Sequence, residues 1–79
     1  MIEVVELVVA ESIAKDIFRD HFGKGGWAKV NSEGNNLIAS FGGSRYCCGF
    51  FKPKSEGEHY DHWIVIESFD DWMSVGKVM

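Results

Sequence analysis

LIASFGGSRYCCGFF, residues 37–51, is the stretch that decides the fold. It consists of two apolar runs separated by a Gly-Gly-Ser turn. Because a glycine pair reaches the positive φ angles that a tight reversal requires, the stretch predicts a β-hairpin with strands near 37–41 and 45–51. The hairpin supplies a sheet on which the rest of the chain can build. It does not indicate a reaction, since no spacing within it is typical of one chemistry.

The chain before the hairpin predicts a strand followed by a helix. Residues 2–9, IEVVELVV, are apolar and β-branched on both alternating faces, with one glutamate on each, which is typical of an inner strand that is partly covered on both sides. From Ala10 to Phe22, apolar residues recur at intervals of three and four between charged ones, which predicts an amphipathic helix of about three turns. Gly23 follows as the C-terminal stop of this helix.

Two short segments connect this helix to the hairpin. Residues 23–27, GKGGW, are glycine-rich, but they follow a helix, whereas a phosphate-binding loop precedes one. We therefore interpret them as a turn. Residues 27–31 predict a short strand, and residues 32–36, SEGNN, predict the turn that leads into the hairpin.

The chain after the hairpin predicts a loop, a strand and a second helix. Residues 52–61, KPKSEGEHYD, are polar and contain proline and glycine, so they are expected to form the longest loop. Residues 62–67, HWIVIE, predict the last strand. Ser68 is placed to cap a short helix, which would bury Phe69 and Trp72 together with Met73 and Gly76 on one inward face.

These elements predict an α+β fold in one domain, residues 1–79. The order is strand, helix, four strands, helix. Short connections between the later strands favour an antiparallel sheet of about five strands, with a long N-terminal helix and a short C-terminal helix packed on it.

The composition is that of a small globular protein. A chain of 79 residues is near the size at which a core alone stabilises the fold by only about 3 to 5 kcal/mol, so a partner or a homodimer would help. No apolar run approaches the roughly 20 residues of a membrane-spanning helix. The first residues lack the basic region of a secretory signal, and we therefore expect a cytoplasmic location and no membrane partner.

The net charge of −4 is distributed unevenly along the chain. Residues 1–22 carry −3, residues 23–54 carry +4, and residues 55–79 carry −5. An acidic total disfavours non-specific binding to nucleic acid and favours a basic protein partner.

The cysteines and histidines form one candidate metal or thiol site. Cys47 and Cys48 are adjacent in a predicted strand, so they should point to opposite faces and remain reduced. Together with His59 and His62, and with Asp61 to orient an imidazole, they supply the residue types of a cysteine nucleophile or a metal centre. Adjacent strand cysteines do not converge on one ion, and so small a core has little room for a catalytic pocket. We expect no metal, no cofactor and no enzymatic activity.

The aromatic and acidic residues favour a protein-binding surface. Six Phe, three Trp and two Tyr are more rings than one sheet face readily buries, and exposed rings are typical interface anchors. The acidic residues after position 55 are expected to face a basic surface of a larger protein and to imitate nucleic-acid phosphates. The predicted partner-binding residues are Glu56, Glu58, Tyr60, Asp61, Trp63, Glu67, Asp70 and Asp71.

An alternative interpretation is a module for single-stranded nucleic acid. Basic and aromatic residues alternate along residues 45–54, where bases could stack on a sheet while cations contact phosphates. The sequence there matches only a fragment of the RNP1 pattern. Tyr46 and Phe50 are expected on one face of their strand, with Phe51 on the other. The residues of this alternative are Arg45, Tyr46, Phe50, Lys52 and Lys54.

In size, acidity and absence of catalytic motifs, the chain resembles small phage-encoded inhibitors of host machinery, including anti-CRISPR proteins. The resemblance lies in size and composition, and no family-specific motif accompanies it. It implies a non-enzymatic module that occupies a surface of a larger bacterial complex.

Overall fold

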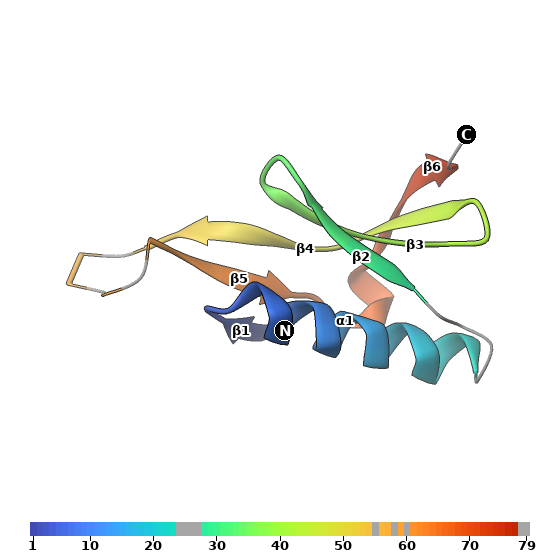
Figure 1. Cartoon of the computed structure of the whole chain (residues 1–79), viewed down its shortest axis with the longest axis horizontal. Coiled ribbons are helices and arrows are strands. Elements are labelled where there is room, and N and C mark those ends of the chain that lie inside the picture. Colours follow the sequence, from blue (N-terminus) through green and yellow to red (C-terminus); the bar gives the residue numbers. More distant parts are fainter. Residues whose placement is uncertain (24–27, 55, 58, 60, 78–79) are drawn as a thin grey trace.

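The computed structural model describes residues 1–23, 28–54, 56–57, 59 and 61–76, together with the backbone of residue 77. In this part of the chain, one long helix and a 3-10 turn pack on an antiparallel sheet, which confirms the predicted α+β fold (Figure 1). The elements are β1 (Ile2–Val4), α1 (Leu7–Phe22), β2 (Lys29–Glu33), β3 (Asn36–Phe41), β4 (Ser44–Pro53), β5 (His62–Ile66), η1 (Phe69–Asp71) and β6 (Met73–Lys77).

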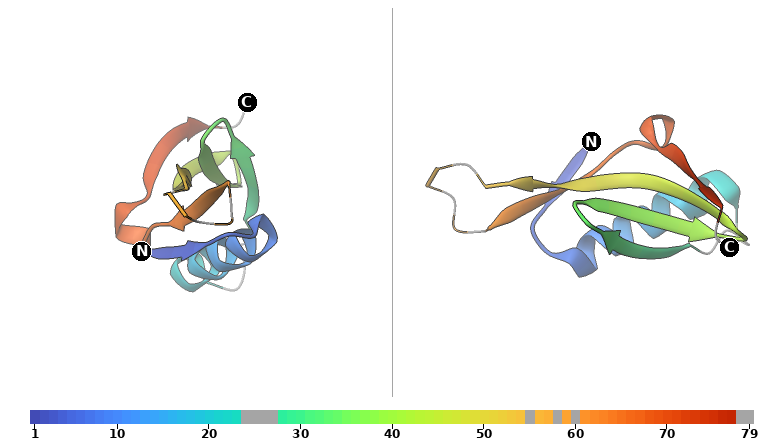
Figure 2. Two further views of the ribbon diagram at one scale, coloured as in Figure 1. Left: turned by 90° about the vertical axis from the view of Figure 1, so that its left-hand side faces the viewer. Right: turned by 90° about the horizontal axis from the view of Figure 1, so that it is seen from above.

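The sheet is organised around β4, its longest strand. The strand order is β1-β5-β4-β3-β2, and β6 also pairs with β4. One edge of β4 pairs with β3, while its other edge pairs with β5 at residues 49–53 and with β6 at residues 44–47. Consequently β5 and β6 follow the same edge of β4 in the same direction, and η1 is a short break between them (Figure 2).

The core lies between α1 and one face of this sheet. Ala10, Ala14 and Phe18 are fully buried at intervals of four residues, so one stripe of α1 faces the sheet. They meet Leu37, Ala39, Cys48, Ile64 and Ile66 from the inner strands, with Val30 and Trp72 at the sides. Burying a side chain such as Phe18 contributes roughly 1.5 to 3 kcal/mol to stability.

The predicted hairpin is confirmed, and it contains a bulge that the sequence did not indicate. Gly42 and Gly43 have φ angles of 57° and 87° at the turn, as the glycine pair predicted. Leu37 is opposite Gly49, but the next residue of β3 is opposite Cys47. Cys48 is therefore the extra residue of a β-bulge, and its thiol lies in the core.

The N-terminal strand is shorter than predicted, and its predicted inner position is wrong. β1 ends at Val4 and pairs only with β5, so it is an edge strand. α1 begins at Leu7, and the N–H of Ala10 donates to the carbonyl of Glu6 at 3.1 Å. Residues 7–9 therefore form the first turn of the helix, although valine favours strands. This turn leads directly into Ala10, the first residue of the buried stripe. The end of the helix at Gly23 is as predicted, with φ at 83°.

The predicted C-terminal helix is instead the three-residue turn η1, followed by β6. Ser68 stands at the N-cap position, but its hydroxyl donates to the Asp71 carboxylate at 2.9 Å and caps no backbone group. Trp72 is buried as expected, whereas Met73 is 70% exposed. The free edge of β4 offers backbone partners to residues 73–77, and this pairing prevails over the local capping signal.

The remaining boundaries differ only slightly from the prediction. The strand predicted at residues 27–31 is found at 29–33, and residues 24–27, including most of the predicted GKGGW turn, lie outside the described residues. β4 extends to Pro53 and shortens the loop that follows. Within the part of the chain that the structure describes, no helix is long and apolar enough to cross a membrane.

Candidate functional site

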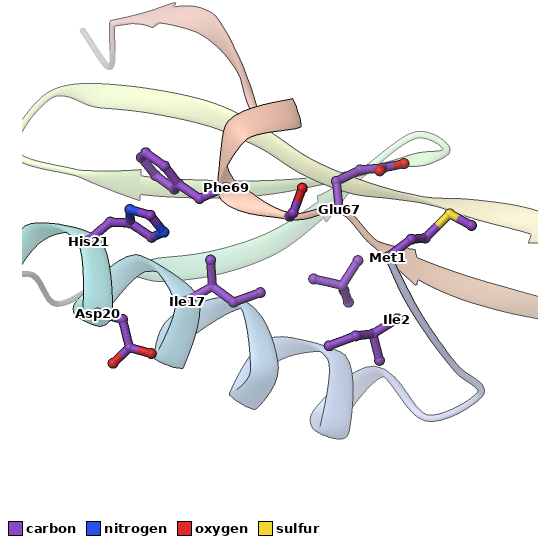
Figure 3. A pocket seen from close by; sticks show the side chains of 9 residues that line it. Met1, Ile2, Ile17, Asp20, His21, Glu67 and Phe69 are labelled. Atoms are coloured by element: carbon purple, nitrogen blue, oxygen red, sulfur yellow. The ribbon is translucent and has the colours of Figure 1, made fainter.

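A cavity of about 270 Å³ lies between α1 and the segment formed by the end of β5 and η1 (Figure 3). Its floor is apolar, and polar side chains stand at its rim. The residues that line it are Met1, Ile2, Ile17, Asp20, His21, Ile66, Glu67, Ser68 and Phe69.

Three elements bring these residues together. Ile17 and His21 are one helical turn apart on α1, so both point toward η1 (Figure 3). Ile2 is directly opposite Ile66, because β1 pairs antiparallel with the end of β5. The chain then leaves the sheet at residue 67, and η1 places Phe69 over the helix.

The wall of the cavity is an aromatic stack. The rings of His21 and Phe69 have centroids 4.1 Å apart and planes 15° apart. Phe69 also contacts Trp72, with centroids 5.1 Å apart. The indole N–H of Trp72 in turn donates to the carbonyl of Glu67 at 2.9 Å, and the N–H of Asp71 donates to the carbonyl of Ser68 at 2.9 Å. These contacts hold η1 in place, so the cavity is preformed.

The two acidic residues at the cavity are placed differently. Glu67 is half-buried at its edge, whereas Asp20 is exposed and Figure 3 shows that its carboxylate points away from the cavity. Asp70 and Asp71 are exposed on η1, the turn that carries Phe69. None of the described lining residues is a lysine or arginine. The site therefore suits a ligand with an apolar body and a cationic end.

The structure divides the predicted acidic surface into two parts. Glu67 lines the cavity, and Asp70 and Asp71 follow the lining residue Phe69 on η1. Glu56 and Asp61 are exposed in the connection between β4 and β5, and the five residues of β5, which span about 17 Å, separate the two groups. Trp63 lies on β5 opposite Lys52. Glu58 and Tyr60 lie outside the described residues.

The two cysteines point to opposite sides of β4, as predicted, and both are free thiols. Cys48 is fully buried, and its thiol donates to the carbonyl of Leu37 at 3.4 Å. Burial raises the pKa of Cys48 from 9.0 to about 12, and the neighbouring Cys47 thiol adds to the rise. Since the thiolate is the nucleophile, Cys48 is chemically inert near neutral pH. Cys47 is half-buried on the other face.

The thiols and imidazoles of the candidate metal or thiol site are not brought together. Cys47 is opposite Met73 whereas His62 is opposite Pro53, a separation of about 20 Å along β4. His59 is exposed in the loop. Among the described residues, no group of three or more His, Cys, Asp or Glu side chains is placed to hold a metal ion.

Asp61 and His62 line a second cavity, of about 560 Å³. Residues of the β2–β3 turn and Phe51 also line this cavity. The rings of Phe51 and His62 are packed edge to face, with centroids 5.1 Å apart. Neither cysteine lines this cavity, so its two titratable residues have no thiol to activate.

The basic and aromatic residues of the nucleic-acid alternative are largely on one face. Phe50, Lys52 and Arg45 occupy the sheet face opposite α1, as the cross-strand register requires. The prediction that Tyr46 shares a face with Phe50 is wrong. The bulge at Cys48 shifts the alternation of side chains between the two faces of β4. The Tyr46 ring instead packs toward α1, with its centroid 6.2 Å from that of the Phe18 ring.

Sequence reasoning missed the α1 side of the cavity. The helical spacing predicts only that Asp20 lies on the polar side of the helix and Ile17 on the apolar side. The sequence feature that could indicate this side of the cavity is His21, a polar side chain within the apolar stripe, four residues after Ile17. Comparisons with protein-family models, curated proteins and solved structures find no match for this chain.

Proposed function

We propose that this chain is a non-enzymatic protein-binding module that holds a basic, amphipathic segment of a larger protein at the cavity between α1 and η1. The observation that carries the proposal is the apolar cavity with Glu67 at its rim, next to the exposed Asp70 and Asp71 on η1. Lysine and arginine have apolar stems and cationic heads, so such a side chain matches the floor and the rim together.

The size of the cavity supports a protein ligand. Pockets for drug-sized molecules have volumes of about 300 to 1,000 Å³, and this cavity is somewhat smaller. It is large enough for one or two anchoring side chains, which commonly carry most of the energy of an interface. Because the stack of His21 and Phe69 preforms one wall, little ordering is required when a side chain enters.

A module of this kind would act by covering a binding surface of its partner. A small acidic protein seated on the basic surface of a larger one excludes whatever else binds there, as an inhibitor of a larger bacterial complex would do. The exposed carboxylates would also accelerate encounter with a basic partner, most strongly at low salt.

The test uses amide chemical shifts of the ¹⁵N-labelled protein during titration with a short peptide of leucine and arginine. We expect the largest shifts at Ile17, Ile66 and Phe69, which line the cavity. Glu67→Gln should weaken the binding about three- to tenfold, because it removes one rim charge. The matched control is Glu56→Gln, which removes the same charge at the distant hairpin tip and should leave the affinity unchanged.

Two outcomes would refute the proposal. One is the absence of shifts at the cavity residues at millimolar peptide. The other is an equal loss of affinity for Glu67→Gln and Glu56→Gln, which would show that net charge alone attracts the peptide.

A further inference from the structure

The sheet face opposite α1 is a second surface, separate from the cavity. Figure 2, seen from above, shows the strands in front of α1, which lies behind the sheet. Cross-strand pairs define this face: Lys52 is opposite Trp63, and Phe50 is opposite Val65. Further along β4, Cys47 is opposite both Ile38 and Met73.

Charge is segregated onto this face. The chain as a whole has twelve acidic and eight basic residues. The strand alternation places two acidic and three basic residues on the face opposite α1, and Lys54 and Asp61, which pair just beyond the strands, add one residue of each sign. The face therefore carries one more positive than negative charge, on a protein that is negative overall. Its acids are Glu3, Glu33 and Asp61, and its bases are Lys29, Arg45, Lys52 and Lys54.

Aromatic rings lie between these cations. Phe50 is 37% exposed, and Trp63 is half-buried on the adjacent strand. Because Trp63 is directly opposite Lys52, Phe50 and Trp63 are diagonal neighbours at the usual spacing of about 7 to 8 Å. Rings at this spacing, flanked by cations, match consecutive bases and phosphates of a single strand.

Two ion pairs position the cations across the face. Lys52 Nζ is 3.0 Å from Glu3 Oε1, and Arg45 pairs with Glu33. Exposed pairs of this type contribute only about 0 to 1 kcal/mol, so a phosphate group can replace either carboxylate at small cost.

We infer that this face binds single-stranded nucleic acid, with bases stacked on Phe50 and Trp63 and phosphates held by Arg45, Lys52 and Lys54. From Arg45 to Lys54 the track along β4 is about 30 Å long, which accommodates several nucleotides. Charge complementarity admits an acidic peptide as well, but the rings between the cations favour stacked bases. This inference is independent of the cavity and of the protein ligand proposed there.

The experiment measures fluorescence anisotropy of a labelled oligothymidine of about 12 nucleotides, titrated with the protein over a range of salt concentrations. Phe50→Ala should weaken binding about five- to tenfold through loss of stacking. Lys52→Ala should weaken it and lower the slope of log affinity against log salt by about 0.7, the value for one phosphate contact.

Glu3→Gln tests most specifically whether Lys52 contacts the nucleic acid. It frees Lys52 on the binding face and should tighten binding about two- to fivefold. Its matched control is Glu11→Gln on α1, which changes the net charge equally but lies on the opposite side of the sheet, and should leave the affinity nearly unchanged. Glu67→Gln at the cavity should also have little effect, which separates this inference from the proposed function.

Three results would overturn the inference: no binding at about 50 mM salt, equal effects of Glu3→Gln and Glu11→Gln, or an oligoglutamate peptide that binds as tightly as the oligonucleotide. The last result would assign the face to an acidic protein.

Discussion

His21 on α1 and Phe69 on η1 stack with ring centroids 4.1 Å apart, and this contact joins the long helix to the turn that follows β5. The same two rings form a wall of the cavity between these elements. The packing of η1 and the proposed binding therefore share one contact, and changes at η1 should affect both.

Phe69→Ala tests the structural part of this relationship. The substitution removes the stack on His21 and the contact with Trp72, and for a half-buried ring we expect a loss of about 2 kcal/mol in the free energy of unfolding. Urea denaturation measures it. The control is Phe50→Ala on the opposite sheet face, which should cost less than about 1 kcal/mol. Equal losses for the two variants would contradict the packing of η1 on α1.

Gly49→Ala tests the register of β4 and β5. A Cβ atom at Gly49 would clash with the backbone carbonyl oxygen of Val65, so the strands would have to separate. We expect a loss of at least about 2 to 3 kcal/mol, or failure to fold. Gly34→Asn is the comparison, because Gly34 has open space and a φ of 60°, which asparagine tolerates, and it should cost less than about 1 kcal/mol. If Gly49→Ala were the milder change in thermal melting, the register would be wrong.

Thiol alkylation tests the placement of the two cysteines. In the native protein at about pH 8, iodoacetamide should modify the half-buried Cys47 and leave the buried Cys48 intact. Mass spectrometry should find one modified thiol in native conditions and two in urea. Cys47→Ser should show none until it unfolds. Native modification of Cys48 would contradict its position in the core.

The Cys48 thiol also predicts an alkaline dependence of stability. Burial raises its pKa from 9.0 to about 12, so between these values the folded state keeps a proton that the unfolded state has lost. Its contribution to the free energy of unfolding is complete below about pH 9, decreases as the pH rises, and is lost as the pH passes about 12. Urea unfolding from about pH 8 to pH 10.5 should show a smaller decrease for Cys48→Ala than for the wild type. Parallel curves for the two proteins would contradict this linkage.

The sequence predicted those elements whose signals are local. Gly42 and Gly43 form the hairpin turn through their own positive φ angles, and Gly23 ends α1 in the same way. The stripe of Ala10, Ala14 and Phe18 repeats within one helix. In each case the residues that show the sequence pattern are the same residues that form the turn, the helix end or the buried stripe.

Predictions failed where distant segments decide the outcome. Ser68 and Asp71 have the spacing of a cap, but residues after Trp72 pair with the free edge of β4, which no local pattern reveals. The bulge at Cys48 likewise depends on how β3 aligns with β4, and it moves Tyr46 to the helix side.

The candidate site was predicted only in part, for the same reason. Glu67 and the η1 carboxylates were expected at a binding surface, but their neighbours on α1 are far away in sequence. Asp20 and His21 reach the site only because α1 crosses the sheet beside β5 and η1, as the contacts around Phe69 show. The hairpin-tip acids Glu56 and Asp61 are near in sequence but distant in space.

The most direct test of the binding proposal is an isotope-filtered NOE experiment on the labelled protein with the unlabelled leucine and arginine peptide. We predict intermolecular NOEs from the peptide's side-chain methylenes and methyls to Ile17, Ile66 and Phe69. NOEs confined to Phe50 and Trp63 on the opposite sheet face, or none at a peptide concentration that saturates binding, would contradict the proposal.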